Sequence, residues 1–305
     1  MPEQPSAALR QIDTPGLSIA YEERGAAGGV PVVLLHGFPY SPRAYDAVAD
    51  NLAAHGLRVI VPYLRGFGPT RFRDPKALRS GEQAALGMDL VELLTALKLD
   101  RPIVAGYDWG GRAACIVSAI RPDLVGGLVT GGGYNLFGPP STQPLPPEIE
   151  HVLWYQYYLH TERGRAMLET NRHGFCRLLW KLWSPGWAFD DETFSRSAAA
   201  LDNPDFVEVV LHSYRHRAGL VAGDPSLGDL AERLEREQPP IDVPTIALYG
   251  DAGPLGGQPA PKRDKFTAYW EYRVLAGAGH NLPQEAPQGF AAAVIDLAAG
   301  IEPRR

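Results

Sequence analysis

Short apolar segments alternate with helix-patterned segments through the first third of the chain. Unbroken apolar runs such as residues 30–35 and 57–62 are typical of strands covered on both faces. Between them, apolar residues recur every three or four positions, most clearly over 81–97. Because strand-helix-strand units connect right-handedly into one sheet, the pattern predicts an α/β fold with a mostly parallel central sheet. The expected strands are 17–23, 30–35, 57–62, 102–105, 125–130, 245–249 and 270–275, and the expected helices are 45–54, 81–97, 112–120 and 289–299.

The pattern changes between residues 139 and 240. This stretch is helix-like and rich in Trp and Tyr, it opens with five prolines between 139 and 147, and it closes with Pro239 and Pro240. Strand signals return only at 245–249. We therefore expect residues 1–138 and 241–305 to form one α/β core, with 139–240 inserted as a helical cap, a size within the usual range for a domain.

Composition restricts the partners and the compartment. The chain has 305 residues with 29 Lys and Arg against 35 Asp and Glu, a net charge of −6, and its basic residues do not cluster. Nucleic acid and anionic membrane surfaces are therefore not expected partners. Residues 1–8 are polar and no run of eighteen apolar residues occurs, which favours a cytoplasmic protein. Two cysteines, Cys115 and Cys176, predict neither a disulfide framework nor a metal site. We expect no cofactor, and either a monomer or a homodimer.

The segment Gly106-Tyr107-Asp108-Trp109-Gly110 lies between an expected strand and an expected helix. This is the Gly-x-nucleophile-x-Gly pattern of a sharp strand-to-helix turn, with aspartate as the nucleophile. The flanking glycines suit a turn that leaves no room for side chains, and the start of a helix keeps a carboxylate ionised. An ordinary helix cap is the alternative interpretation of Asp108.

Two further segments complete a catalytic pattern. His36-Gly37-Phe38-Pro39 follows an apolar strand, where the N–H of Phe38 can join that of Trp109 in an oxyanion hole. His280 follows the last expected strand, which is the position of a catalytic base. A structural loop histidine is the alternative for His280.

Together these motifs resemble the α/β-hydrolase superfamily, and within it the epoxide hydrolase and haloalkane dehalogenase branch. The resemblance covers essentially the whole chain, including Arg65-Gly66-Phe67-Gly68-Pro69-Thr70. It implies the α/β-hydrolase fold with a helical cap. An attacking carboxylate forms an ester that water reopens once His280 takes a proton, whereas serine would form an inert ether at a saturated carbon. Ordinary esterase activity is therefore disfavoured.

The cap tyrosines favour an epoxide over a halide as the leaving group. Haloalkane dehalogenases of this branch carry Asn where this chain has Phe38, and fluoroacetate dehalogenases carry Arg where it has Trp109, with only Arg112 a turn further on. Epoxide hydrolases carry two cap tyrosines that hydrogen-bond the oxirane oxygen, and Tyr155 and Tyr214 match them best. A neutral phenol is a suitable donor to a developing alkoxide. Epoxide hydrolysis is the leading prediction, a haloalkane or haloacid dehalogenase is the alternative, and simple aromatic packing is the alternative for the tyrosines.

The substrate is expected to be a small apolar or aromatic molecule, because the cap is rich in aromatic residues. Trp180, Trp183 and Trp187 share one helical face, which predicts cap core with one of them facing the pocket. The residues expected to contact the substrate are His36, Pro39, Tyr158, Trp180 and Trp183.

The acid that orients the base is missing from its usual place. The resemblance puts it at Gly253. Asp251 is the preferred substitute, Asp264 is a second, and 131–135 offers no carboxylate but only Asn135. If no acid serves His280, the chain is a family member that has lost hydrolysis and binds or rearranges a small molecule, since losing the orienting acid costs about 10⁴ in turnover.

Overall fold

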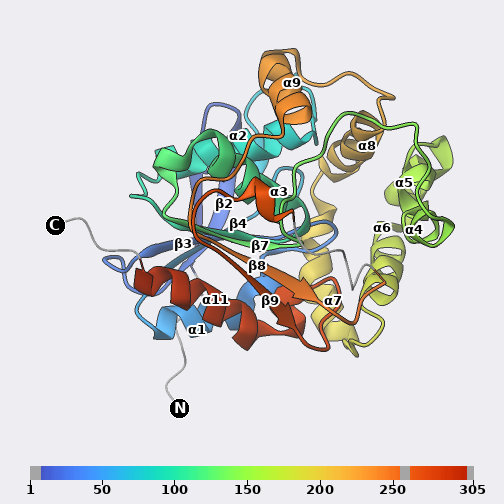
Figure 1. The fold of residues 1–305 in the computed structure, drawn as a ribbon. Coiled ribbons are helices and arrows are strands. Elements are labelled where there is room, and N and C mark those ends of the chain that lie inside the picture. Colours follow the sequence, from blue (N-terminus) through green and yellow to red (C-terminus); the bar gives the residue numbers. More distant parts are fainter. Residues whose placement is uncertain (1–7, 255–261, 301–305) are drawn as a thin grey trace.

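The computed structural model describes residues 8–254 and 262–300, so most of the polar N-terminal segment lies outside the described residues. Its strands form one nine-stranded sheet in the order β1-β2-β4-β3-β6-β7-β8-β9, with β5 paired to β2 (Figure 1). The strands are β1 (Ala8–Asp13), β2 (Leu17–Arg24), β3 (Pro31–Leu35), β4 (Arg58–Pro62), β5 (Arg71–Phe72), β6 (Ile103–Gly106), β7 (Gly127–Gly131), β8 (Thr245–Gly250) and β9 (Trp270–Leu275).

Six of these strands are parallel, and the three at the β1 end pair antiparallel. The predicted α/β fold with a mostly parallel sheet is therefore confirmed. The sequence missed β1, whose side chains are nearly all exposed and carry no apolar alternation, and β5, which has only two residues.

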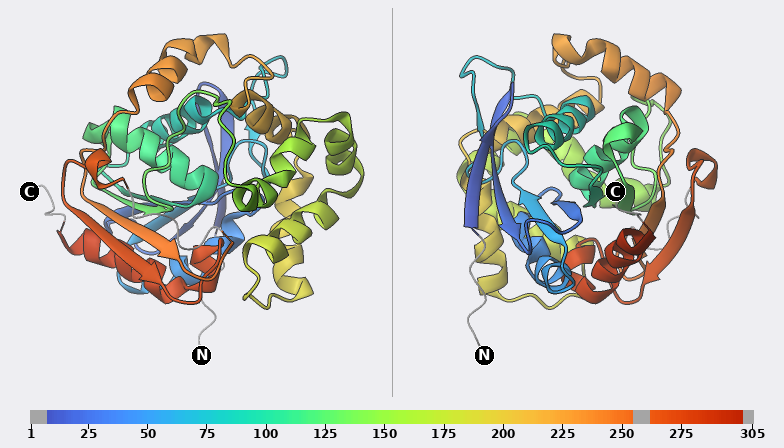
Figure 2. Two further views of the ribbon diagram at one scale, coloured as in Figure 1. Left: turned by 45° about the vertical axis from the view of Figure 1, so that its right-hand side comes forward. Right: turned by 90° about the vertical axis from the view of Figure 1, so that its left-hand side faces the viewer.

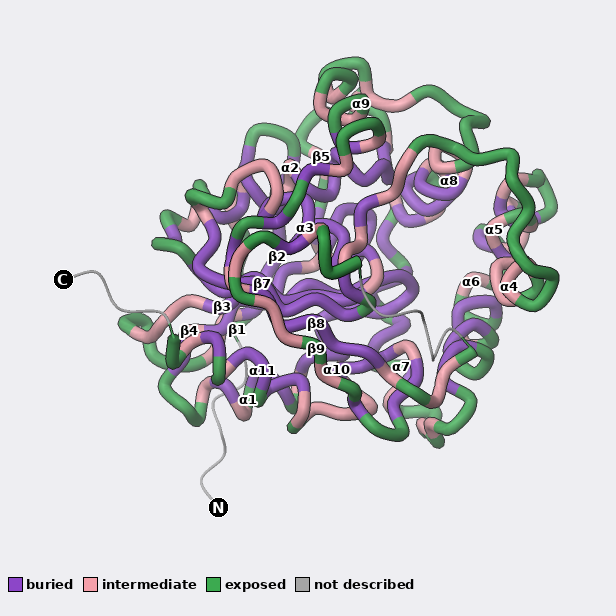
Figure 3. Tube along the Cα trace, viewed as in Figure 1, coloured by how far each residue is buried: buried purple, intermediate pink, exposed green. Residues whose placement is uncertain are grey.

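Helices cover both faces of the sheet. α1 (Asp46–Ala54) and α11 (Pro287–Gly300) pack together on one face, and α2 (Gln83–Ala96) and α3 (Asp108–Ile120) on the other (Figures 1 and 2). Val32, Val33 and Leu34 in β3 are completely buried between these layers, which explains why the central strands are continuous apolar runs (Figure 3).

The chain between β7 and β8 is helical. Its helices are α4 (Pro147–Val152), α5 (Trp154–Leu159), α6 (Glu162–Trp183), α7 (Asp191–Ala198), α8 (Phe206–Arg217) and α9 (Gly228–Glu237). α4 to α8 gather beyond one edge of the sheet, whereas α9 returns to pack on α2 (Figure 1). The division into a core and a cap at 139 and 240 stays a prediction, and α9 contacts the core side of that boundary. A short helix, α10 (Leu282–Glu285), precedes α11.

The parallel strands bring the catalytic motifs expected from the sequence to the same end of the sheet. The segments that follow β3, β6, β7 and β8 start at the carboxyl ends of neighbouring strands, where ligands bind in sheets of this kind. Among the described residues, no helix is both long and apolar enough to cross a membrane. In the same residues, no three His, Cys, Asp or Glu side chains gather as metal ligands.

Candidate active site

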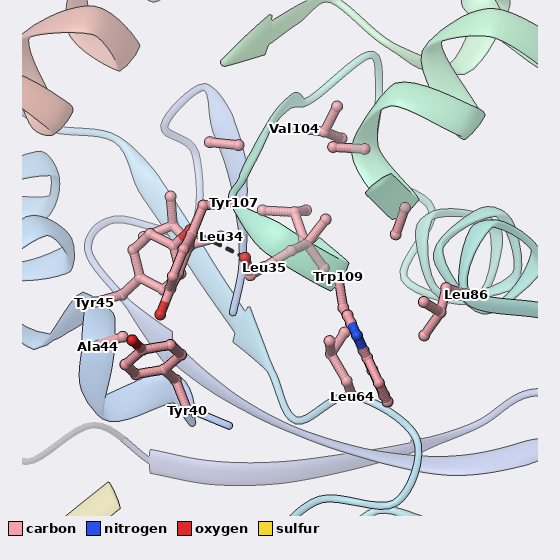
Figure 4. Close-up of a cluster of buried hydrophobic side chains, with 14 of the residues drawn as sticks. Leu34, Leu35, Tyr40, Ala44, Tyr45, Leu64, Leu86, Val104, Tyr107 and Trp109 are labelled. Atoms are coloured by element: carbon pink, nitrogen blue, oxygen red, sulfur yellow. Dashed lines mark hydrogen bonds between the residues drawn. The ribbon is translucent and has the colours of Figure 1, made fainter. Parts of the chain in front are cut away.

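Asp108 lies on a strained turn that glycines make possible. It is the first residue of α3 directly after β6, and its φ of 52° is in the left-handed region. A Cβ on Gly106 would lie 2.5 Å from the carbonyl carbon of Gly110, and one on Gly110 would lie 2.0 Å from the carbonyl oxygen of Leu35. Both positions therefore exclude any side chain. Figure 4 shows that the neighbours Tyr107 and Trp109 point to opposite sides of this turn.

The carboxylate of Asp108 is held between a main-chain donor and a histidine. The N–H of Phe38 donates to Oδ1 at 2.7 Å, and Nε2 of His280 lies 3.7 Å from Oδ2. Burial alone raises the pKa of Asp108, but the His280 ring, the charge of Arg112 and the main-chain N–H of Trp109 outweigh it, so the pKa falls below the ordinary 3.8. Asp108 is thus ionised at neutral pH and faces both N–H groups of the predicted oxyanion hole.

The second ring nitrogen of His280 faces a phenol. Nδ1 lies 3.3 Å from the hydroxyl of Tyr40, a buried residue whose ring stacks on the imidazole with centroids 5.7 Å apart. Tyr40 and Tyr107 belong to the group of buried tyrosines in Figure 4. Gly253, where an acid was expected, does line the same cavity as His280.

The structure does not bring the expected substitute acids to His280. Asp251 accepts a hydrogen bond from the N–H of Gly277 at 2.6 Å, and so stabilises its own loop. Asp264 lies in the 3₁₀ turn Arg263–Lys265, and among the described residues it makes no hydrogen bond to the histidine. Asn135 donates to the main-chain oxygen of Asp108 at 3.0 Å. The predicted orienting role of Asp251 therefore has no support in this geometry.

Glu285 holds the histidine loop without touching the ring. It accepts hydrogen bonds from the N–H of Gly279 at 2.7 Å, the N–H of Asn281 at 2.9 Å and the hydroxyl of Ser184 at 2.6 Å. The Ser184 hydroxyl in turn accepts from the N–H of His280 at 3.0 Å. Sequence reasoning missed Glu285 and Ser184, because they bind the backbone of this loop rather than its side chain.

The two cap tyrosines lie together at the site. Tyr155 from α5 and Tyr214 from α8 meet edge to face with ring centroids 5.4 Å apart, and both are buried. Burial and the nearby Asp108 raise the pKa of Tyr155, and burial, Tyr155 and Asp108 raise the pKa of Tyr214 well above 10. Both phenols therefore keep their protons at neutral pH and are hydrogen-bond donors.

Asp108, His280, Tyr155 and Trp183 are among the residues that line a cavity of about 370 Å³, whereas Tyr214 packs behind Tyr155 and is not among its lining residues in the described ranges. Trp183 is thus the tryptophan of its helical face that reaches the cavity. The other residues expected to contact substrate serve the surrounding structure instead. His36 accepts from the N–H of Leu64 at 3.2 Å, with its pKa lowered to about 4 by burial.

Three further residues that were expected to contact substrate, Pro39, Tyr158 and Trp180, also support the structure around the cavity. Trp180 donates from Nε1 to the carbonyl oxygen of Pro39 at 3.1 Å, which ties α6 to the loop after β3. Tyr158 packs among cap aromatic rings, with its centroid 6.1 Å from that of Phe175. None of the three is among the residues that line the cavity within the described ranges.

Comparison with known proteins shows the family of this chain. The family model for the alpha/beta hydrolase fold matches residues 30–283. The chain belongs to the α/β-hydrolase fold family. A haloalkane dehalogenase of Mycobacterium marinum is 36% identical over 255 residues, which cover 81% of this chain and 76% of the relative. Epoxide hydrolase A of Mycobacterium tuberculosis is 26% identical over 329 residues, which cover 97% of this chain and 98% of the relative.

A solved structure gives the same picture for this α/β-hydrolase. A protein of Klebsiella pneumoniae, provisionally described as an epoxide hydrolase, has a TM-score of 0.91 and 43% identity over 95% of this chain and 97% of that chain. The resemblance drawn from the motifs is therefore confirmed at the level of the family and of its epoxide hydrolase and haloalkane dehalogenase relatives.

The α/β-hydrolase cavity also contains residues that the motifs did not single out. Arg112, Phe137 and Arg217 line it together with Gln156, whose Nε2 donates to the hydroxyl of Tyr155 at 3.1 Å. Arg112 was visible in the sequence one turn after Asp108, but nothing in the sequence placed Arg217 of the cap beside it.

Proposed function

We propose that this α/β-hydrolase opens a small organic epoxide to a diol through an ester on Asp108. The observation that carries the proposal is the pair of buried, protonated phenols, Tyr155 and Tyr214, at the site of an ionised carboxylate. An epoxide oxygen leaves its carbon while still attached to the molecule, so it needs a proton donor rather than an exit for an anion. The relatives named above include an epoxide hydrolase that spans almost the whole chain.

The first step uses the two carboxylate oxygens differently. Phe38 binds Oδ1, which leaves Oδ2 free to attack a ring carbon of the epoxide. The new C–O bond forms as the ring C–O bond breaks, and the released oxygen takes the proton of Tyr155 or Tyr214. The raised pKa values of these phenols keep the proton available until the alkoxide develops.

The second step reopens the ester with water. Nε2 of His280 takes a proton from water, and the hydroxide adds to the carboxyl carbon of Asp108. Charge develops on Oδ1, where the N–H groups of Phe38 and Trp109 stabilise it. Cleavage of the bond to the ester oxygen releases the diol, which takes the proton back from His280, while the proton of the restored carboxyl group returns to the phenolate.

Oxygen-18 labelling tests this route. Over many turnovers in oxygen-18 water, label should accumulate in the peptide that contains Asp108, and diol should form. Tyr155→Phe and Tyr214→Phe should each slow epoxide opening. Diol formation with no label in Asp108 would contradict the ester, because direct attack of water leaves the carboxylate oxygens unexchanged.

A haloalkane dehalogenase is the second candidate, and the 36% identity to such an enzyme favours it. The same ester chemistry then releases a halide and needs no phenol proton. Halide release from alkyl halides, unaffected by Tyr155→Phe and Tyr214→Phe, would support this candidate over the epoxide hydrolase.

A further inference from the structure

Two arginines from distant segments reach the active-site cavity. Arg112 lies in α3, one turn after Asp108, and Arg217 is the last residue of α8, three residues after Tyr214. Both guanidinium groups lie against the ring of Phe137, with Cζ 4.0 Å from its centroid for Arg112 and 3.5 Å for Arg217. Core and cap thus each contribute one cation to the same wall of the cavity.

Neither arginine has a counter-ion of its own. Within residues 8–254 and 262–300, Arg112 and Arg217 make no ion pair and no hydrogen bond, and Nε of Arg112 is buried without a partner. Arg65 shows how this chain otherwise buries a guanidinium: it binds both oxygens of Asp89 at 2.6 Å and the carbonyl oxygen of Ser80 at 2.8 Å. The cavity arginines are the exception to this pattern.

The environment of these arginines is costly for positive charge. Arg112 is only 7% exposed. Burial and the neighbouring charge of Arg217 together lower its pKa to about 10, and the opposing charge of Asp108 offsets only part of this shift. Burial also lowers the pKa of Arg217. Asp108 balances only one of these two buried cations, so the excess positive charge is kept at a cost in folding stability, and an anionic ligand reduces that cost.

We propose that the substrate of this site carries a carboxylate, which Arg112 and Arg217 bind while Asp108 attacks the epoxide carbon. This inference rests on the proposed function for the identity of the reactive group. Two guanidinium groups and the Asp108 carboxylate leave one positive charge, which a monoanion balances. A phosphate dianion would instead leave a net negative charge beside an attacking carboxylate. Guanidinium forks match the planar geometry of a carboxylate.

The positions also limit the length of the substrate. Asp108 and Arg112 are four residues apart on one helix, so their backbones are separated by about 6 Å, one helical turn. Tyr214 and Arg217 are similarly spaced on the cap side. This close spacing on both sides of the cavity favours a short-chain epoxy carboxylic acid over a long one.

The experiment compares a short epoxy acid with its neutral primary amide, which has the same shape and reactive ring. With the unmodified protein, kcat/KM for the acid should exceed that for the amide at least 100-fold, and Arg112→Gln and Arg217→Gln should each lower this ratio 10- to 100-fold. Arg215→Gln, on the same helix but bonded to Glu162, is the matched control and should leave the ratio unchanged. An acid and an amide turned over equally well by the unmodified protein would overturn the proposal, as would Arg112 and Arg217 variants that keep the ratio.

Binding separates this proposal from the proposed function. The diol acid should bind the unmodified protein in calorimetry, and Arg217→Gln should weaken that binding at least 10-fold. If no epoxide is turned over and this binding difference persists, epoxide hydrolysis is wrong and the carboxylate site stands. If epoxide amides are turned over but the diol acid binds no better than the diol amide, the carboxylate site is wrong and the hydrolase stands.

Discussion

The nucleophile and the base of this site are held in different ways. Asp108 is fixed by backbone geometry, because glycines pack against the turn where no Cβ fits and a main-chain N–H binds its carboxylate. His280 is fixed mainly by side chains: Ser184 of a distant segment and Glu285 of the adjoining α10 bind its loop, and Tyr40 meets its ring. A position fixed by backbone contacts leaves a motif in the sequence, whereas one fixed by scattered side chains does not.

Loss of the base should produce the largest effect. His280→Gln removes the group that activates water but leaves the attack of Asp108 on the epoxide in place. Turnover should fall by about 10⁴-fold or more, and the ester should accumulate. Intact mass spectrometry should show the protein plus one substrate, with Asp108→Asn as the control that forms no adduct. A variant with neither adduct nor turnover would contradict the two-step route.

A substitution at Gly37 tests how strictly the backbone fixes the position of Asp108. A Cβ at Gly37 would lie 2.4 Å from the Cβ of Asp108, so Gly37→Ala must displace the nucleophile or its turn. We expect a loss of about 3 kcal/mol of unfolding free energy and at least 100-fold in kcat/KM. Gly16→Ala is the control, because a Cβ there meets nothing within 4 Å. Equal behaviour of the two variants in urea unfolding and in kinetics would show that the turn adapts.

A carboxylate at Gly253 tests whether the base lacks support. A Cβ at Gly253 would lie 3.0 Å from the carbonyl oxygen of Trp183 and 3.4 Å from Cα of Gly279, so the substitution needs only a small shift. If His280 has no acid, Gly253→Asp should raise ester hydrolysis at least tenfold, and Gly253→Asn, of the same shape without the charge, should not. No gain from Asp in single-turnover experiments would mean that the existing network already orients the ring.

Removal of the Tyr40 hydroxyl should have a smaller effect. Tyr40→Phe deletes the group 3.3 Å from Nδ1 of His280 and keeps the stacked ring. Ester hydrolysis should slow by about tenfold, which corresponds to one hydrogen bond, while formation of the ester keeps its rate. Tyr45→Phe is the control, since its hydroxyl donates to the carbonyl oxygen of Leu35 instead. An equal slowing of both steps would indicate a general loss of packing.

The limits of sequence reasoning follow from the same comparison. The parallel sheet and Asp108 were predictable, because apolar periodicity and glycine spacing are local consequences of burial and of a tight turn. Arg217 was not, because it reaches the cavity from a distant cap helix. Glu285 follows His280 closely in the chain, but it binds the main-chain N–H groups of Gly279 and Asn281, and no side-chain pattern in the sequence marks such contacts. The role of Asp251 stays a prediction: its carboxylate accepts a hydrogen bond from the N–H of Gly277 and, among the described residues, makes none to His280.

The smallest expected effect concerns the influence of His280 on the charge of Asp108. The pH dependence of ester formation measures it. Burial raises the pKa of Asp108, and His280, Arg112 and the N–H of Trp109 together bring it below 3.8. A lowered pKa keeps the nucleophile ionised at every pH above that value, so the rate of ester formation should be flat from about pH 8 down to about pH 5. The raised pKa values of Tyr155 and Tyr214 keep the donors protonated over the same range.

His280→Gln should change this profile in a defined direction. It removes the contribution of the histidine to lowering the pKa of Asp108 and leaves burial in place, so the pH at which ester formation fails should move upward. Rapid quenching followed by intact mass measurement gives the rate of this step in both proteins. Circular dichroism at each pH serves as the control for unfolding. In the unmodified protein, a fall in the rate of ester formation that begins above about pH 5 would show that burial determines the pKa of Asp108. The contacts that position the carboxylate would then not suffice to keep it ionised.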